Sequence, residues 1–146
     1  MAAERGPGFE QLVAQWSEVE HRAALKRSDT RYLVGHPPAA PPAGFALLQN
    51  IGDRHEGVKL RRVAVTAPGT GFGQALLAAV VDWVFEHTRD DRLWLDVFTH
   101  NERARHVYRR LGFVEDGLLR QAYLMPDGTR VDRVIMSMLR SEWAAR

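Results

Sequence analysis

The spacing of apolar and polar residues predicts strands and helices that alternate along most of the chain. Apolar residues at alternate positions predict strands over residues 57–65 and 92–98, and in the second strand Asp96 falls on the face opposite Leu93 and Leu95. Apolar residues three and four positions apart predict helices over residues 73–87 and 101–111. The pattern therefore indicates a strand–helix–strand unit followed by a second helix.

Turn signals predict a hairpin on each side of this unit. Four prolines in residues 35–44 exclude helix and central strand, so this segment connects the β-like runs 30–34 and 44–49. The Asp127–Gly128 pair separates two further strands, residues 112–124 and 130–139. Ser17 and Glu20 are spaced as a capping box for a helix before the first hairpin. We expect one domain over residues 1–146, a mixed α/β sheet with flanking helices.

Composition excludes several classes of protein. There are no cysteines, which excludes disulfides, a cysteine nucleophile and thiolate metal sites. A formal net charge of +2 is too weak to argue for nucleic acid but suits a small anionic ligand. Without a signal-like start or an apolar run long enough to cross a bilayer, we expect a cytoplasmic protein with no membrane partner.

Three glycines at alternate positions, Gly69, Gly71 and Gly73, stand between the predicted strand and the helix that follows it. Glycines at a helix start leave backbone N–H groups accessible, and these groups together with the helix dipole favour a phosphate. A Walker loop is excluded because no Gly-Lys-Ser/Thr follows. A dinucleotide fingerprint also fails, because its last position falls on Gln74 or Leu76.

Four ordered elements of the chain resemble the GCN5-related N-acetyltransferase (GNAT) family. They are a strand ending in Val63-Ala64-Val65, the Gly-x-Gly helix start, a helix with Asn101-x-x-Ala-x-x-x-Tyr108, and the Leu-Gly-Phe of residues 111–113. The resemblance, which is to small bacterial acetyltransferases, implies a mainly antiparallel twisted sheet flanked by helices. It also implies transfer of an acetyl group from acetyl-CoA to a primary amine, on a small molecule or a polypeptide N-terminus.

The same resemblance implies roles for individual residues. Tyr108 would protonate the departing thiolate, and Asp96 would remove the proton of the amine. Without cysteine, the acetyl group would pass to the amine directly. The residues that would bind acetyl-CoA are Val63, Ala64, Val65, Gly69, Thr70, Gly71, Phe72, Gly73, Gln74, Asn101 and Tyr108.

Structural roles stand beside these functional ones. Asn101 is a strong helix N-cap, and Tyr108 lies on the apolar stripe of its helix. Asp96 could form a structural hydrogen bond with a helix end or with a neighbouring arginine. Arg105 or Arg109 could approach the 3′-phosphate of CoA. The histidines lack metal-ligand spacing, so no metal is expected. An acceptor pocket or ordinary packing would explain Trp16, His21, Tyr32 and Tyr123.

The sequence also departs from the family pattern. Pro68 stands where the family has Gln or Arg before its glycines, and no strand is apparent in residues 1–10. An absent first strand would expose a sheet edge, which a second copy could cover in a homodimer. Two other functions are compatible with parts of the pattern: a non-catalytic module that binds acyl-CoA, and an interaction protein that uses the fold without a cofactor.

Overall fold

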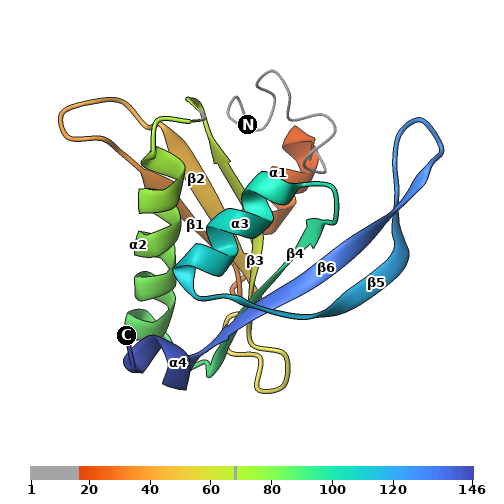
Figure 1. Cartoon of the computed structure of the whole chain (residues 1–146). Helices are drawn as coiled ribbons and strands as arrows, with labels where there is room; N and C mark the ends of the chain where they lie inside the picture. The colour runs from red at the N-terminus through yellow and green to blue at the C-terminus, as the bar shows by residue number, and fades with distance from the viewer. Residues whose placement is uncertain (1–16, 68) are drawn as a thin grey trace.

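A computed structural model describes residues 17–67 and 69–146 as one sheet with helices on both faces (Figure 1). The elements in chain order are α1 (Glu18–Leu25), β1 (Arg31–Gly35), β2 (Gly44–Gln49), β3 (Val58–Val65), α2 (Phe72–His87), β4 (Arg92–Phe98), α3 (Glu102–Leu111), β5 (Val114–Leu124), β6 (Arg130–Leu139) and α4 (Arg140–Ala144). The strand and helix boundaries agree closely with those predicted from periodicity.

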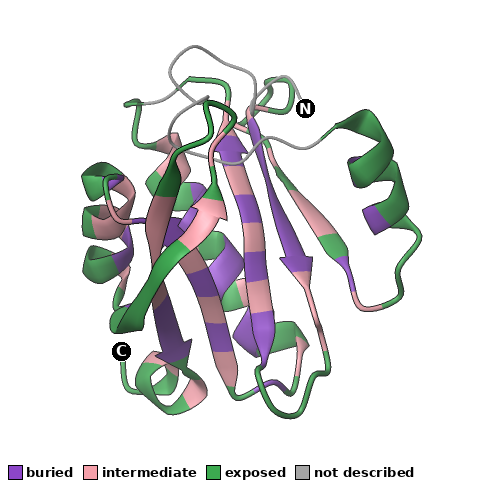
Figure 2. Ribbon diagram, turned by 90° about the vertical axis from the view of Figure 1, so that its right-hand side faces the viewer, coloured by how far each residue is buried: buried purple, intermediate pink, exposed green. Residues whose placement is uncertain are grey.

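The six strands lie in the order β1-β2-β3-β4-β6-β5. Every neighbouring pair is antiparallel except β3 and β4, which run parallel and are joined through α2. Helices α2 and α3 cover one face of the sheet, and α1 lies on the opposite face (Figures 1 and 2). The expected mixed, mainly antiparallel sheet flanked by helices is confirmed.

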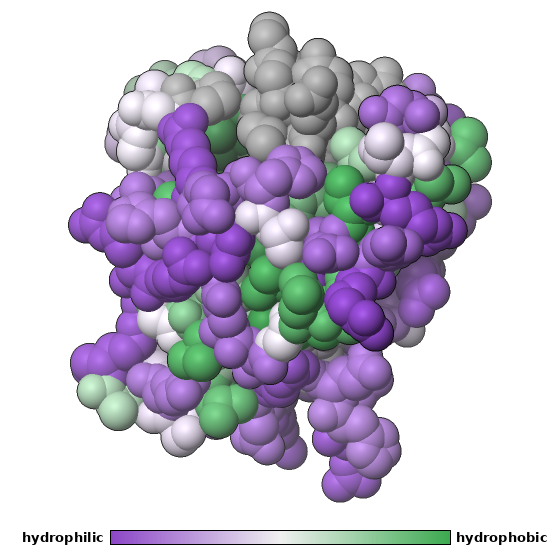
Figure 3. Space-filling model, turned by 45° about the vertical axis from the view of Figure 1, so that its right-hand side comes forward, coloured by the Kyte–Doolittle hydropathy of each residue, from purple (hydrophilic) through white to green (hydrophobic). Residues whose placement is uncertain are grey.

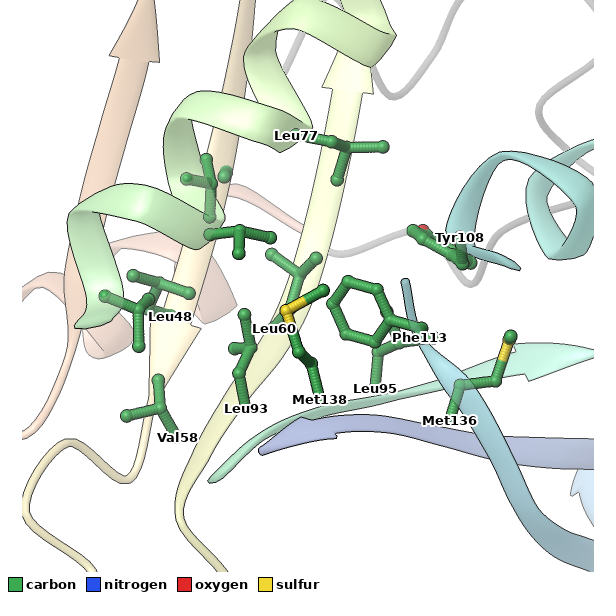
Figure 4. Close-up of a cluster of buried hydrophobic side chains, with 14 of the residues drawn as sticks. Leu48, Val58, Leu60, Leu77, Leu93, Leu95, Tyr108, Phe113, Met136 and Met138 are labelled. Carbon is green, nitrogen blue, oxygen red and sulfur yellow. The ribbon is translucent and has the colours of Figure 1, made fainter. Parts of the chain in front are cut away.

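One apolar core joins α2 and α3 to the sheet. Buried and intermediate positions alternate along β3, as expected for a strand with one face on a core (Figure 2). Figure 4 shows side chains from several strands, among them Leu60, Leu93 and Leu95, converging with Tyr108 and Phe113. These residues hold α3 at a fixed position on the sheet.

The parallel pair in the middle of the sheet is joined only at its beginning. Val58 pairs with Leu93 and Lys59 pairs with Trp94, but β3 continues to Val65 and β4 to Phe98 without further pairing. A bulge on β3 accompanies this separation, because Leu47 and Leu48 of β2 pair with residues 62 and 60 and skip Arg61. A bulge bends a strand and increases its twist, so the edge of β3 beyond Lys59 turns away from β4.

Local signals in the sequence are also confirmed. Ser17 and Glu20 form the predicted capping box, and Gly112 ends α3 with φ of 107°. The prediction that the first strand is absent concerns residues 1–10, which lie outside the described residues. In the described sheet, β1 and β5 are the edge strands.

Among the described helices, none has the length and apolar character that a membrane span requires.

Candidate active site

The glycine-containing loop adopts a backbone that requires glycine at two positions. Gly69 and Gly71 both have φ of 84°, and Gly71 is the N-cap of α2. A Cβ added to Gly71 would meet nothing within 4 Å, so the space in front of this helix end is open among the described residues. Here glycine is needed for the left-handed backbone and leaves room for a group to approach it.

Backbone donors at the start of α2 face this open space. Gly71 offers no side chain to cap the helix, and the first intrahelical bond runs from Ala75 N to Gly71 O. The N–H of Phe72 reaches only Thr70 Oγ1, at 3.4 Å. The N–H groups of Gly73 and Gln74 therefore remain available at the positive end of a 16-residue helix. These features fit a diphosphate.

An arginine of α3 that the sequence analysis did not name lies beside this loop. The Nη2 of Arg103 on α3 is 3.6 Å from the position that a Cβ would take on Gly69. By contrast, Arg105 and Arg109 both bind Glu115 on β5, and Arg105 also binds the carbonyl of Thr99. Both guanidinium groups thus have Glu115 as a partner, and the approach of Arg105 or Arg109 to the 3′-phosphate stays a prediction.

The segment Val63–Val65 lies at the edge of the opening between β3 and β4. On one side it pairs with β2, with Val63 opposite Ala46 and Ala64 opposite Phe45. Its other edge has no strand pairing to β4, because that pairing ends at Lys59. An extended arm of a ligand could use backbone groups of this edge as a short additional strand does.

Tyr108 reaches the same opening from the α3 side. It is 8% exposed and packs edge-on against Phe113, with ring centroids 5.8 Å apart. Figure 4 shows its hydroxyl oxygen directed away from α3, toward the side on which Leu77 lies. Burial raises the pKa of the Tyr108 phenol to about 12, and the nearby charge of Asp96 contributes. No described residue makes a hydrogen bond with this hydroxyl.

Asp96 lies on the opposite face of β4 and is enclosed by two cations. Its Oδ2 accepts a hydrogen bond from Lys59 Nζ at 2.8 Å, and its Oδ1 accepts one from Arg133 Nη1 at 3.3 Å. The ammonium of Lys59 also lies 4.4 Å from the centre of the Trp94 ring. The arginine partner suggested by the sequence is thus present, and Lys59 is a second partner that the sequence analysis missed.

Asn101 caps α3, as its sequence position predicts. Its side-chain oxygen accepts a hydrogen bond from Ala104 N at 3.2 Å, and the residue is buried. The cap fixes the start of the helix that carries Arg103 and Tyr108.

The predicted acceptor-pocket residues divide into two groups on the sheet. His21 of α1 and Tyr32 of β1 are joined through Nδ1 and the phenol oxygen at 2.6 Å, and both pack with Phe45. Tyr123 of β5 lies against Phe98 at the end of β4, with ring centroids 5.1 Å apart. Trp16 lies outside the described residues, as does Pro68.

A hollow of about 620 Å³ lies elsewhere and contains none of the predicted site residues. It is lined by residues of the 51–57 and 87–92 segments, before the starts of β3 and β4. The described residues also contain no group of three or more His, Asp or Glu side chains able to hold a metal ion. The glycine loop, Tyr108 and Asp96 thus take no part in this hollow.

A family model described as the acetyltransferase (GNAT) family matches residues 5–113 of the chain. The chain belongs to the GNAT family. The match spans the glycine loop, Asp96, Asn101 and Tyr108, so the resemblance inferred from four short motifs is confirmed.

Relatives with assigned names share part of this chain. The ribosomal protein bS18-alanine N-acetyltransferase of Haemophilus influenzae is 32% identical over 96 residues, 64% of this chain and 62% of its own length. The spermidine N(1)-acetyltransferase of Vibrio cholerae is 30% identical over 84 residues, 58% of this chain and 48% of its own length. The chain thus spans between about half and three-fifths of these relatives.

Solved structures of the fold include one that holds ligands. Spermidine N-acetyltransferase from Vibrio cholerae, in complex with CoA and spermine, matches 87% of this chain and 75% of its own. The TM-score is 0.76 at 25% sequence identity. The arrangement of strands and helices described above is therefore that of a GNAT protein.

Proposed function

We propose that this protein transfers the acetyl group of acetyl-CoA to a primary amine. One observation carries the proposal: an opening between β3 and β4 has the glycine loop at its end, Tyr108 on one face and Asp96 on the other. The relatives named as N-acetyltransferases, and the solved structure that contains CoA, support the same activity.

In this proposal acetyl-CoA occupies the α2–α3 side of the opening. Its diphosphate accepts hydrogen bonds from the N–H groups of Gly73 and Gln74, and the backbone of residues 69–72 approaches it closely. The pantetheine arm runs along Val63–Val65, with Asn101 beside it. Arg103 supplies the positive charge that a side chain at the position of Pro68 does not.

The acceptor amine then approaches from the face that carries Asp96. The nitrogen lone pair forms a bond to the acetyl carbonyl carbon, and the carbon–sulfur bond breaks. The nitrogen loses one proton, which Asp96 or a water bound to it accepts. Tyr108 donates a hydrogen bond to the departing sulfur, which then takes a proton from water. The products are an N-acetylated amine and the CoA thiol. Holding both reactants in one opening supplies much of the rate enhancement.

Release of the CoA thiol over a panel of amines and N-terminal peptides tests the activity. Gly71→Val should abolish the stabilisation that acetyl-CoA gives in thermal unfolding, about 2.7 kcal/mol at 100 times the Kd, because a branched side chain would fill the open space. Gly52→Val is the matched control, since Gly52 also has positive φ and open space around it. Binding without thiol release from any amine would instead support a non-catalytic acyl-CoA module.

We also propose that two copies associate through a sheet edge. Strand β5 is an edge strand with exposed apolar side chains at Val114, Leu118 and Leu119. The face in Figure 3 is mostly hydrophilic, with apolar surface gathered near its centre. Light scattering should give twice the mass of one chain, and Leu118→Lys should return the mass to that of a monomer. A monomeric wild-type protein would exclude the dimer.

We place the reaction in the cytoplasm, where acetyl-CoA is supplied to enzymes of this kind. Fractionation of cells that express the tagged protein tests this location. Recovery with membranes or outside the cell would contradict it.

A further inference from the structure

Two buried donors on the acceptor side of the sheet have no partner. In the described part of the chain, the Nε1 of Trp94 and the Nε of Arg133 are buried and make no hydrogen bond. Strand pairing places Trp94 opposite Ser137 and Phe98 opposite Arg133, with Asp96 between them on β4. Both donors therefore belong to the sheet face that carries Asp96. Buried donors without partners are rare and costly, so each requires an explanation.

The same face carries an excess of positive charge beside Asp96. The single carboxylate of Asp96 is shared by Lys59 and Arg133. The nearest acidic residue on β6, Asp132, accepts the backbone N–H of Gln121 at 2.7 Å. On β5, Asp116 binds Arg92 instead. One positive charge of the Lys59–Asp96–Arg133 cluster thus remains without a described counter-charge.

We propose that the acceptor is an amine that carries a carboxylate close to its nitrogen, and that Arg133 binds this carboxylate. The inference rests on the proposed acetyl transfer and names the class of its acceptor. An amine placed at Asp96 lies next to Arg133, because Nη1 of Arg133 is 3.3 Å from Asp96 Oδ1. A carboxylate one to three bonds from the nitrogen reaches the guanidinium from that position. A free amino acid, with two bonds between nitrogen and carboxylate carbon, and a polypeptide that begins with Asp, with three, both meet this requirement.

A polyamine fits this face poorly. Its second and third ammonium groups would enter a region where Lys59 and Arg133 already exceed the charge of Asp96. A carboxylate would instead neutralise the cluster by pairing with the guanidinium of Arg133, whose side chain is 21% exposed. Charge at this site therefore selects between classes of amine acceptor.

Matched acceptors that differ only in the carboxylate test the proposal. The kcat/KM for thiol release should be at least about tenfold higher for alanine than for alaninamide, or for a peptide beginning with Asp than for one beginning with Asn. A preference within the first pair would identify the acceptor as a free amino acid, and a preference within the second would identify it as a polypeptide. Spermidine should be the poorest substrate of the panel.

Variants of Arg133 show whether this residue is responsible. Arg133→Gln should bring the ratio of kcat/KM between the carboxylate acceptor and its amide close to one, while the Kd for acetyl-CoA stays unchanged. Arg133→Lys should restore part of this ratio. Arg130→Gln, on the same strand but exposed, should keep the wild-type ratio.

The possible outcomes separate this inference from the activity itself. Equal or better turnover of alaninamide, the Asn peptide and spermidine by the wild-type protein would overturn the inference and leave acetyl transfer intact. This result does not depend on whether any variant folds. An absence of thiol release with every acceptor would overturn the proposed function and the inference with it.

Discussion

Removing the Tyr108 hydroxyl should slow acetyl transfer without destabilising the protein. The phenol has a pKa of about 12 against an ordinary value of 10.0, so it is fully protonated at pH 7. An ordinary thiol has a pKa near 8.5, roughly 3.5 pKa units below that of this phenol. Complete proton transfer from the phenol to a free thiolate would therefore cost about 5 kcal/mol. Tyr108 should therefore act mainly by donating a hydrogen bond to the sulfur as negative charge develops on it.

The size of the effect follows from this role. A hydrogen bond to a charged group contributes about 1.5–3 kcal/mol, so Tyr108→Phe should lower kcat by roughly 10- to 150-fold. The KM for acetyl-CoA should change little, because the interaction forms only as the thiolate departs. Since no described residue bonds the hydroxyl, the free energy of unfolding should change by no more than about 1 kcal/mol.

Steady-state kinetics and urea unfolding of the same variants measure both quantities. Phe113→Leu is the matched control: it perturbs the ring that packs on Tyr108 but keeps the hydroxyl, so it should lower stability more than kcat. The wild-type rate should show no loss attributable to Tyr108 below about pH 11, because the pKa is raised. A kcat for Tyr108→Phe within twofold of wild type would refute the role.

Three further changes test other parts of the structure. Arg103→Gln should raise the acetyl-CoA Kd roughly 5- to 15-fold in calorimetry, whereas the exposed Arg110→Gln should not. Gly57→Ala should cost at least about 2–3 kcal/mol in urea unfolding, because its Cβ would lie 2.3 Å from the Arg92 carbonyl oxygen at positive φ; a cost below about 1 kcal/mol would contradict this packing. Hydrogen bonds from two arginines lower the pKa of Glu115, so its contribution to stability is present above about pH 4.5 and is lost as the pH falls through the folded-state value. Glu115→Gln should flatten that acid loss, and an unchanged acid unfolding curve would argue against these bonds.

Local periodicity and turn chemistry were sufficient to predict the individual elements. Buried and less buried positions alternate over residues 92–97, and the strand β4 covers the predicted residues 92–98. The Asp127–Gly128 turn and the αL residue Gly112 act through backbone preferences of a few neighbouring residues. Such signals do not depend on the rest of the fold, so they can be read from a single sequence.

The environment of the candidate site depends on contacts between distant parts of the chain. Lys59 and Arg133 each lie 37 residues from Asp96, and only the strand order and register bring them to it. The bulge at Arg61 shifts register without any glycine or proline to mark it. Likewise, Arg103 appears in sequence as one of several helix-surface arginines, and its place beside Gly69 follows from how α3 packs.

Hydrogen–deuterium exchange with and without acetyl-CoA tests the central claim most directly. The account predicts that acetyl-CoA slows exchange in peptides covering residues 61–65, 69–74 and 101–108, which surround the β3–β4 opening. Slowed exchange confined to the hollow formed by residues 51–57 and 87–92, or no change anywhere at saturating acetyl-CoA, would contradict it.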